Sequence, residues 1–295
     1  RFVLINLDIE QVTVPSKEEL ETEDKWILSR LNDLTKEVCE NLDRFELGVA
    51  LAKLYDFVWS EFCDWYIELL KPRFADKGSR SNLVAQNVIA YVLGQTLKLL
   101  HPFMPFITEE IRSSLPPISG DEAESIMISA YPSYDPALSF PEDEERMEKL
   151  IELIRAIRNR RSEMNVPPSK KAKLYVVSDR KDLYGEKTTK FFLKLAYASE
   201  VEYPASHSDE GSVQIVAGSA TAYIPLGELV DLEKEKARLK AEEEKTRGEI
   251  KRLEGKLSNE GFVSKAPAAV VEGERAKLEK YRLTLSQLEE ALSKM

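Results

Sequence analysis

The stretch Met147–Lys173, MEKLIELIRAIRNRRSEMNVPPSKKAK, contains the change from helix to strand around which the rest of the chain is organised. Leu150, Ile154 and Ile157 recur at helical spacing, so one face of this helix is apolar and is expected to pack. Two consecutive prolines then stop the helix. The helix end and the residues after the prolines are basic: Arg155, Arg158, Arg160, Arg161, Lys170, Lys171 and Lys173 stand against a single acidic residue, Glu163.

This basic stretch lies in a chain whose formal net charge is -10. Salt confines charge effects to roughly 8 to 10 Å, so the local reversal of sign matters more than the total. One interpretation is a contact with a nucleic-acid backbone. The other is a solvated helix end whose cations complement the helix dipole. The spacing alone favours the second.

Length and composition limit the number of domains and argue against membrane, disulfide-rich and metal-binding classes of protein. A chain of 295 residues predicts two or three domains. No segment is expected to span a membrane, and the first residues carry no signal-peptide pattern but read as the tail of a helix, as if the chain were cut from a longer one. Cys39 and Cys63 are expected to be buried, reduced thiols, too few for a disulfide framework or a four-ligand zinc site. His101 and His207 have no carboxylate pattern around them, so no metal site is expected.

Residues 24–115 are expected to form an α-helical bundle. Ile27, Leu31, Leu34 and Val38 make one apolar stripe of the first helix. The next helix, from about Phe45, is apolar almost all round, which predicts a central position, with its tryptophans Trp59 and Trp65 in the core. A third helix covers 83–100, and after a bend at two prolines a fourth covers 107–115. Short connections between long helices predict antiparallel neighbours.

A small α+β domain is expected next. Residues 125–129 and 174–177 read as strands and 187–198 as a helix. Residues 213–224 read as two strands joined at Gly218-Ser219, a dipeptide suited to a hairpin turn. The boundaries expected from these patterns are 1–118 for the bundle, 119–227 for the linker and α+β domain, and 228–295 for the last block.

The last block carries two heptad series. The first is Leu232, Lys236, Leu239, Glu243, Thr246, Ile250, Leu253 and Leu257; the second is Val271, Glu274, Leu278, Tyr281, Leu285, Leu288 and Leu292. Pro267 and Gly261 interrupt the helix between them, which predicts an antiparallel coiled-coil hairpin about 40 Å long. A dimerising coiled coil is the alternative, but an in-chain partner has the advantage of effective concentration.

Four stretches carry a resemblance: WSEFCDWYIELLKPRF, HPFMPFITEEI, AIRNRRSEMNVPPSKKAKLYV and LSNEGFVSKAPAAVVEGERAKLEKY. In this order they resemble the C-terminal part of bacterial valyl-tRNA synthetases, over most of the chain. The resemblance implies a mainly α fold: an anticodon-binding helical bundle, a small α+β domain and a coiled-coil arm. Related isoleucyl enzymes typically end in a cysteine-rich zinc module, which two distant cysteines cannot build.

The resemblance also implies where tRNA binds. In the family, the segment from the end of the first bundle helix to the start of the next reads the anticodon loop. The corresponding residues here are Arg1, Lys17, Lys25, Trp26 and Arg30. Trp26 shares the polar face of its helix, so it is expected either to stack on a base or to pack against the preceding loop or a missing domain.

Two further groups complete the expected tRNA contacts. Near the basic helix end, the residues expected to contact the anticodon stem, or to brace the bundle against the α+β domain, are Arg158, Asn159, Arg161 and Asn165. In the arm, the resemblance implies contacts to the tRNA elbow, and the candidates are Lys240, Arg247, Lys251, Lys265, Arg275 and Arg282. Because acidic residues alternate with these cations, a merely solvated face is the alternative.

The catalytic machinery of the resembled family is missing from this sequence. Neither histidine belongs to a His-x-Gly-His signature, and no Lys-Met-Ser-Lys-Ser loop occurs. No catalytic residue and no cofactor are therefore expected in this chain, although the parent enzyme uses ATP and Mg²⁺ to attach valine to its tRNA. The expected partners are valine tRNA and the absent catalytic and editing domains. We expect a cytoplasmic monomer with no membrane contact; a helical scaffold that dimerises through its coiled coil is the alternative function.

Overall fold

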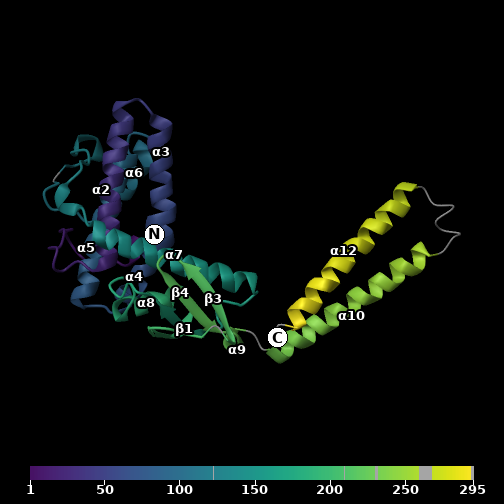
Figure 1. Ribbon diagram of the computed structural model, residues 1–295. Helices are drawn as coiled ribbons and strands as arrows, with labels where there is room; N and C mark the ends of the chain where they lie inside the picture. The colour runs from purple at the N-terminus through teal and green to yellow at the C-terminus, as the bar shows by residue number, and fades with distance from the viewer. Residues whose placement is uncertain (122, 209, 230–231, 259–267, 294–295) are drawn as a thin grey trace. The chain divides into compact units, whose positions relative to one another are not determined.

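The computed structural model describes residues 1–121, 123–208, 210–229, 232–258 and 268–293 (Figure 1). The chain forms two compact units. The first unit comprises Arg1–Ala156, Ser178–Ala196 and Val216–Ala220; the second comprises Ile157–Val177, Tyr197–Ile215 and Thr221–Met295. Helix α7 (Pro141–Glu163) and the last two strands run through both.

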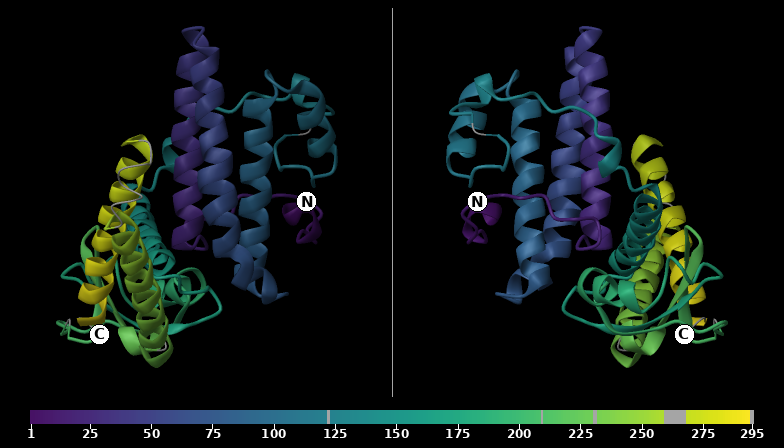
Figure 2. Two further views of the ribbon diagram at one scale, coloured as in Figure 1. Left: turned by 90° about the vertical axis from the view of Figure 1, so that its right-hand side faces the viewer. Right: turned by 90° about the vertical axis from the view of Figure 1, so that its left-hand side faces the viewer.

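The first unit is mainly helical. Its helices in chain order are α1 (Phe2–Ile5), α2 (Thr22–Asp43), α3 (Leu47–Asp56), η1 (Phe57–Tyr66), α4 (Ile67–Ala75), α5 (Arg80–Leu100), α6 (Pro105–Ser113), η2 (Ile126–Ile128), η3 (Pro136–Leu138), α7 and α8 (Glu186–Leu195). The long helix α2, the run from α3 to α4, and α5 lie side by side (Figure 2). The predicted stripe is confirmed, because Ile27, Leu31, Leu34 and Val38 are all buried.

The apolar second helix is less regular than its sequence predicts. Its middle third, η1, is a π-helix between the α-helical segments α3 and α4. π-Helical turns are rare, and no residue pattern in this stretch predicts one. The expectation that Trp59 is buried is wrong: it is 55% exposed on an outer face that it shares with Tyr55, whereas Trp65 is buried as predicted.

Helix α5 has the length and composition of a membrane span, contrary to the expectation that no segment does. Within the described residues it is the only helix that meets this test, and 72% of its most apolar 18-residue window is buried inside the protein. Packing therefore explains its apolarity. Gly94 shows how tight that packing is, since a Cβ there would lie 2.7 Å from Cδ1 of Ile118.

Two local expectations about this unit are also wrong. Residues 125–129 form the short 3₁₀ helix η2 and no strand, because the side chain of Ser125 caps the turn through the amide of Met127. Cys39 and Cys63 are half-buried and not fully buried. Burial still raises the pKa of both thiols, and they are free.

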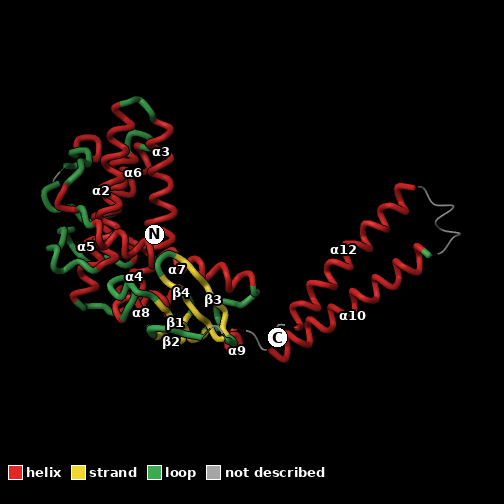
Figure 3. Tube along the Cα trace, viewed as in Figure 1, coloured by secondary structure: helices red, strands yellow, loops and turns green. Residues whose placement is uncertain are grey.

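The second unit contains a small mixed sheet (Figure 3). Its strands are β1 (Ala172–Val177), β2 (Ala198–Glu202), β3 (Ser212–Ala217) and β4 (Ala220–Pro225), in the order β2-β1-β4-β3. β1 runs parallel to β2 and antiparallel to β4. Gly218 has a φ of +58° and turns the chain between β3 and β4, as the Gly-Ser dipeptide predicts. Strand β2 was not predicted from the sequence, because its exposed glutamates break the apolar alternation.

After the short helix α9 (Leu226–Leu229), two long helices end the unit, α10 (Leu232–Leu257) and α12 (Ala268–Ser293). They pack on each other through residues of both heptad series, with Ile250, Leu253 and Leu278 buried. An ion pair joins Lys256 to Glu274 at 3.4 Å, and another joins Arg282 to Glu254 at 2.8 Å. The residues predicted to turn between the series, and Lys265 with them, lie outside the described residues.

Candidate nucleic-acid interface

Trp26 is buried, which agrees with one of the two positions left open by the sequence. Its side chain is only 3% exposed, so the ring is part of the core and is not accessible to a base. The segment before α7 covers this face of α2, since the amide of Phe140 donates to Oγ of Ser29 at 2.9 Å, and Asn32 and Asp135 exchange two hydrogen bonds. This segment therefore packs on α2 at Ser29 and Asn32. Of the two interpretations of Trp26, packing is the one that the structure supports.

Arg30 is engaged within the bundle. Its Nε and Nη2 atoms donate to the carboxylate of Glu61 at 2.8 and 3.0 Å, and Nη1 lies 3.9 Å from Oε2 of Glu144. The hydrogen bonds to Glu61 raise the pKa of Arg30. Arg30 lines a groove of about 540 Å³ with more carboxylates than cations around it. Its charge is neutralised, so it is a poor candidate for a phosphate contact.

Arg1, Lys17 and Lys25 remain available at the surface. Arg1 and Lys17 are exposed and Lys25 is half-buried. None of the three forms an ion pair with the described residues, and the ammonium group of Lys17 lies 5.5 Å from the ring centroid of Phe140. These three cations are what the first unit offers from the predicted anticodon-binding set.

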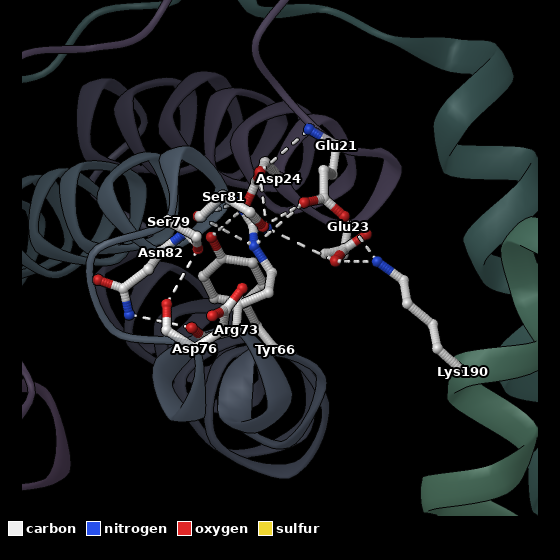
Figure 4. A network of polar contacts seen from close by, with 10 residues as sticks. All are labelled: Glu21, Glu23, Asp24, Tyr66, Arg73, Asp76, Ser79, Ser81, Asn82 and Lys190. Carbon is white, nitrogen blue, oxygen red and sulfur yellow. Dashed lines mark hydrogen bonds and ion pairs between the residues drawn. The ribbon is translucent and has the colours of Figure 1, made fainter.

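Beside Lys25, the first turn of α2 takes part in a buried polar network (Figure 4). Nη1 of Arg73 lies 2.9 and 2.8 Å from the two carboxylate oxygens of Asp24, and the hydroxyl of Tyr66 donates to the same carboxylate at 2.9 Å. Arg73 also donates to the carbonyl oxygen of Ser81. Burial raises the pKa of Asp24 while Arg73 favours its ionised form, so the carboxylate depends on that guanidinium.

Helix α8 contributes the second cation of the network. Nζ of Lys190 lies 2.6 Å from Oε2 of Glu21 and 2.9 Å from Oε1 of Glu23. Burial opposes ionisation of Glu21, but hydrogen bonds from Lys190 and Ser81 outweigh it and lower its pKa to about 2. Glu23 is 1% exposed, and burial raises its pKa against the pull of Lys190. Three carboxylates thus share two cations.

The basic helix end predicted at α7 is a compact cluster in the second unit. The guanidinium groups of Arg158 and Arg161 each lie 5.6 Å from the ring centroid of Tyr197. Arg161 is 3% exposed and donates to the carbonyl oxygens of Pro167 and Lys170, so it fixes the turn from α7 into β1. Burial lowers its pKa. The guanidinium of Arg161 is thus engaged within the second unit and has little surface to offer to RNA.

Arg158, Asn159 and Asn165 are the accessible members of this cluster. Arg158 is half-buried, with Nη2 3.3 Å from the hydroxyl of Tyr197, and Asn159 and Asn165 are exposed. Asn165 has a φ of +54°, the left-handed conformation that lets the chain leave the helix. Among the described residues no carboxylate pairs with Arg158 or Arg161. The cluster therefore carries positive charge that is not neutralised within the part of the chain that the structure describes.

The arm cations fall into two groups. Arg247 pairs with Glu243, and Arg282 pairs with Glu254 and Glu279. The other described candidates are exposed and form no ion pair with described residues: Lys240, Lys251 and Arg275. This second group has the charge available for a phosphate backbone.

Sequence reasoning missed Arg73, Lys190 and Tyr197. The partners of Arg73 and Lys190 lie 49 and 167 residues away in the sequence, so no local pattern marks either cation. Tyr197 follows a helix and has a φ of +57°, which is unusual for an aromatic residue. The described residues contain no group of three His, Cys, Asp or Glu side chains that could hold a metal ion.

Comparison with known proteins gives two family matches. Residues 24–176 match the family described as the anticodon-binding domain of tRNA ligase. Residues 231–295 match the valyl tRNA synthetase tRNA binding arm. The second match favours an RNA-binding arm over the alternative of a dimerising scaffold, which nothing in the comparisons supports.

Similar curated proteins are valine–tRNA ligases. The one from Clostridium acetobutylicum is 46% identical over 99% of this chain and 33% of its own length, and the one from Clostridium perfringens is 47% identical over the same shares. The enzyme from Bacillus anthracis is 39% identical over 95% of this chain and 32% of its own length. The chain thus spans about a third of the length of the curated relatives that it matches. With more than half of its residues matched, the chain belongs to the family of anticodon-binding domains of tRNA ligases.

Proposed function

We propose that this chain is the tRNA-binding part of a valine–tRNA ligase. The observation that carries the proposal is the succession of two RNA-binding modules, the anticodon-binding domain and the tRNA-binding arm, in one chain with valine–tRNA ligase relatives. The domain boundaries that we assign are 1–118, 119–227 and 228–295.

In this proposal the bundle contacts the anticodon loop with Arg1, Lys17 and Lys25. Their charges are not taken up by carboxylates of the described residues, which supports contacts to phosphates. Arg158, Asn159 and Asn165 contact the anticodon stem, while Arg161 holds the helix end in place. Phosphate contacts position an RNA, and base contacts give specificity, so the discrimination between anticodons must come from groups beside these cations.

The last two helices form an antiparallel coiled-coil hairpin that contacts the tRNA elbow. The burial of Leu253 against Leu278 and the ion pairs between the helices support this arrangement. Lys240, Lys251 and Arg275 are the strongest candidates on the arm, because their charges are not paired within the described residues. Arg247, Lys265 and Arg282 remain candidates from the resemblance alone.

The chain by itself is proposed to bind tRNA without catalysis. Activation of valine with ATP and Mg²⁺ would belong to the part of the relatives that this chain does not match, and the chain would work as a monomer with that part in the cytoplasm. The sequence supports the lack of catalysis, since it has neither signature of the family's active site.

Binding of the chain to valine tRNA, and to the same tRNA with an altered anticodon, across a salt series tests the proposal. We expect tighter binding of the matched tRNA and a steep fall of affinity with salt. Equal binding of both tRNAs would leave only backbone contacts. Absence of binding to either at low salt, or a dimer in light scattering without RNA affinity, would contradict the proposal.

A further inference from the structure

The first turn of α2 brings together three carboxylates, those of Glu21, Glu23 and Asp24, next to the cation Lys25. Acidic residues suit a helix N-terminus because they complement its dipole. They do not suit a surface that binds RNA, because each exposed carboxylate repels phosphates within about 8 to 10 Å. The network of Figure 4 resolves this conflict by pairing all three carboxylates internally.

The two cations of the network pair most closely with different carboxylates. Arg73 is buried, and its guanidinium is held by Asp24 and by the carbonyl oxygen of Ser81. It lies 3.5 Å from Glu23 and 3.4 Å from Glu21, farther than from Asp24. Lys190 makes the short contacts to those two residues, at 2.9 and 2.6 Å. Removal of Lys190 would therefore leave three carboxylates for one guanidinium.

We propose that Lys190 is a positioning residue for RNA binding: its ammonium group neutralises Glu21 and Glu23, holds α8 against the first turn of α2, and so keeps this end of the bundle attractive to phosphates. The inference rests on the proposed function. Lys190 acts through the two carboxylates, which take two of the three N–H donors of its Nζ.

The test compares four variants by tRNA affinity at low salt, after circular dichroism has established folding. Lys190→Met is expected to weaken binding about fivefold, because Glu21 and Glu23 both lose the ammonium group that neutralises them. Lys190→Arg keeps the charge and is expected to bind like the wild type. The double variant Lys190→Met with Glu21→Gln removes the more exposed of the two carboxylates, while Arg73 stays 3.5 Å from buried Glu23, and binding is expected to recover to within about twofold.

Lys187→Met is the matched control. Lys187 lies one turn earlier on α8, is exposed and forms no ion pair with described residues, so its loss removes one charge without touching the carboxylates. It is expected to weaken binding less than Lys190→Met does. Equal effects of the two would contradict the inference.

Two other outcomes would overturn it. If the double variant binds as weakly as Lys190→Met, Lys190 contacts RNA directly. If Lys190→Met binds like the wild type, the carboxylates need no neutralisation. Should the wild type bind no tRNA, the proposed function fails, and amide hydrogen exchange decides the inference. Helix α8 must then exchange faster in Lys190→Met than in the wild type and in Lys190→Arg, and unchanged exchange would refute the inference.

Discussion

Nη1 of Arg73 in α4 lies 2.8 Å from Oδ2 of Asp24 in α2, and both side chains are buried. This pair joins two helices at the end of the bundle where the chain carries its candidate anticodon-binding cations. Breaking a buried pair by removing one partner leaves an uncompensated charge, which typically costs 3–5 kcal/mol.

Arg73→Met is therefore expected to lower the free energy of unfolding by about 3–5 kcal/mol, measured by urea denaturation. Arg80→Met is the control, because Arg80 is exposed and its one ion pair with a described residue is that with Glu19; such surface pairs contribute under about 1 kcal/mol. Equal losses of unfolding free energy in the two variants would mean that the buried pair stabilises the fold no more than a surface pair does.

Glu21 makes the free energy of unfolding depend on pH. Its pKa is about 2 in the folded chain against an ordinary value of 4.5, so its ionised form stabilises the fold. This contribution is complete above about pH 5 and is lost as the pH falls toward about 2. Because the side chain is about a third exposed, we expect a loss on the order of 1 kcal/mol.

Urea denaturation of the wild type and of Glu21→Gln at about pH 6 and about pH 3 measures this contribution. The difference between the two proteins should shrink at the lower pH. Burial raises the pKa of Glu23, so this residue contributes with the opposite sign; because the charge of Glu21 raises that pKa further, Glu21→Gln also changes the contribution of Glu23. A difference that does not change with pH would rule out Glu21 as the titrating group.

The positions of the tryptophans can be checked by fluorescence. A variant that keeps only Trp59 should be quenched strongly by acrylamide, and one that keeps only Trp26 weakly, since their side chains are 55% and 3% exposed. Trp26→Ala should cost about 3–5 kcal/mol of stability. Trp26→Phe should keep the fold and the preference between tRNAs; loss of that preference in a folded Trp26→Phe protein would restore the stacking role.

Trp26 and Trp59 show where sequence reasoning ends. Periodicity identifies the face of a helix that meets its first neighbour, and the stripe from Ile27 to Val38 was predictable for this reason. It does not reveal a second layer, such as the segment at Phe140 that is hydrogen-bonded to Ser29 on the same helix. Nor does it reveal that an apolar helix leaves one face open, as α3 and η1 do at Tyr55 and Trp59.

The candidate site was likewise predictable only where it depends on residues that are close together in the sequence. Clusters of like charge within a few residues, such as the end of α7, are visible in the sequence. Neutralisation is not, because the partner of a cation lies elsewhere in the chain: Arg30 is paired with Glu61, and Lys190 with Glu23. The sequence therefore predicted cations near the interface but not which of them keep their charge available.

The arm offers a separate test of packing and of binding. Leu253→Ala is expected to cost about 2–4 kcal/mol of the pairing between α10 and α12, because Leu253 is buried between them. Lys251→Ala, two residues away and exposed, should leave thermal unfolding unchanged but weaken tRNA binding and reduce its salt dependence by about one charge. A stable Lys251→Ala protein with unchanged affinity would remove this residue from the proposed elbow contact.

Arg158 and Arg161 flank the ring of Tyr197 but are expected to respond differently to substitution. Arg161→Gln should destabilise the second unit, because the buried guanidinium donates to the carbonyl oxygens of Pro167 and Lys170. Arg158→Gln should leave stability within about 1 kcal/mol, since that side chain is half-buried and its hydrogen bond to Tyr197 is long. Its effect should be a loss of tRNA affinity that is equal for matched and altered anticodons, as expected of a phosphate contact. Urea denaturation and tRNA titration of both variants check this, and a loss of affinity confined to the matched tRNA would instead assign base recognition to Arg158.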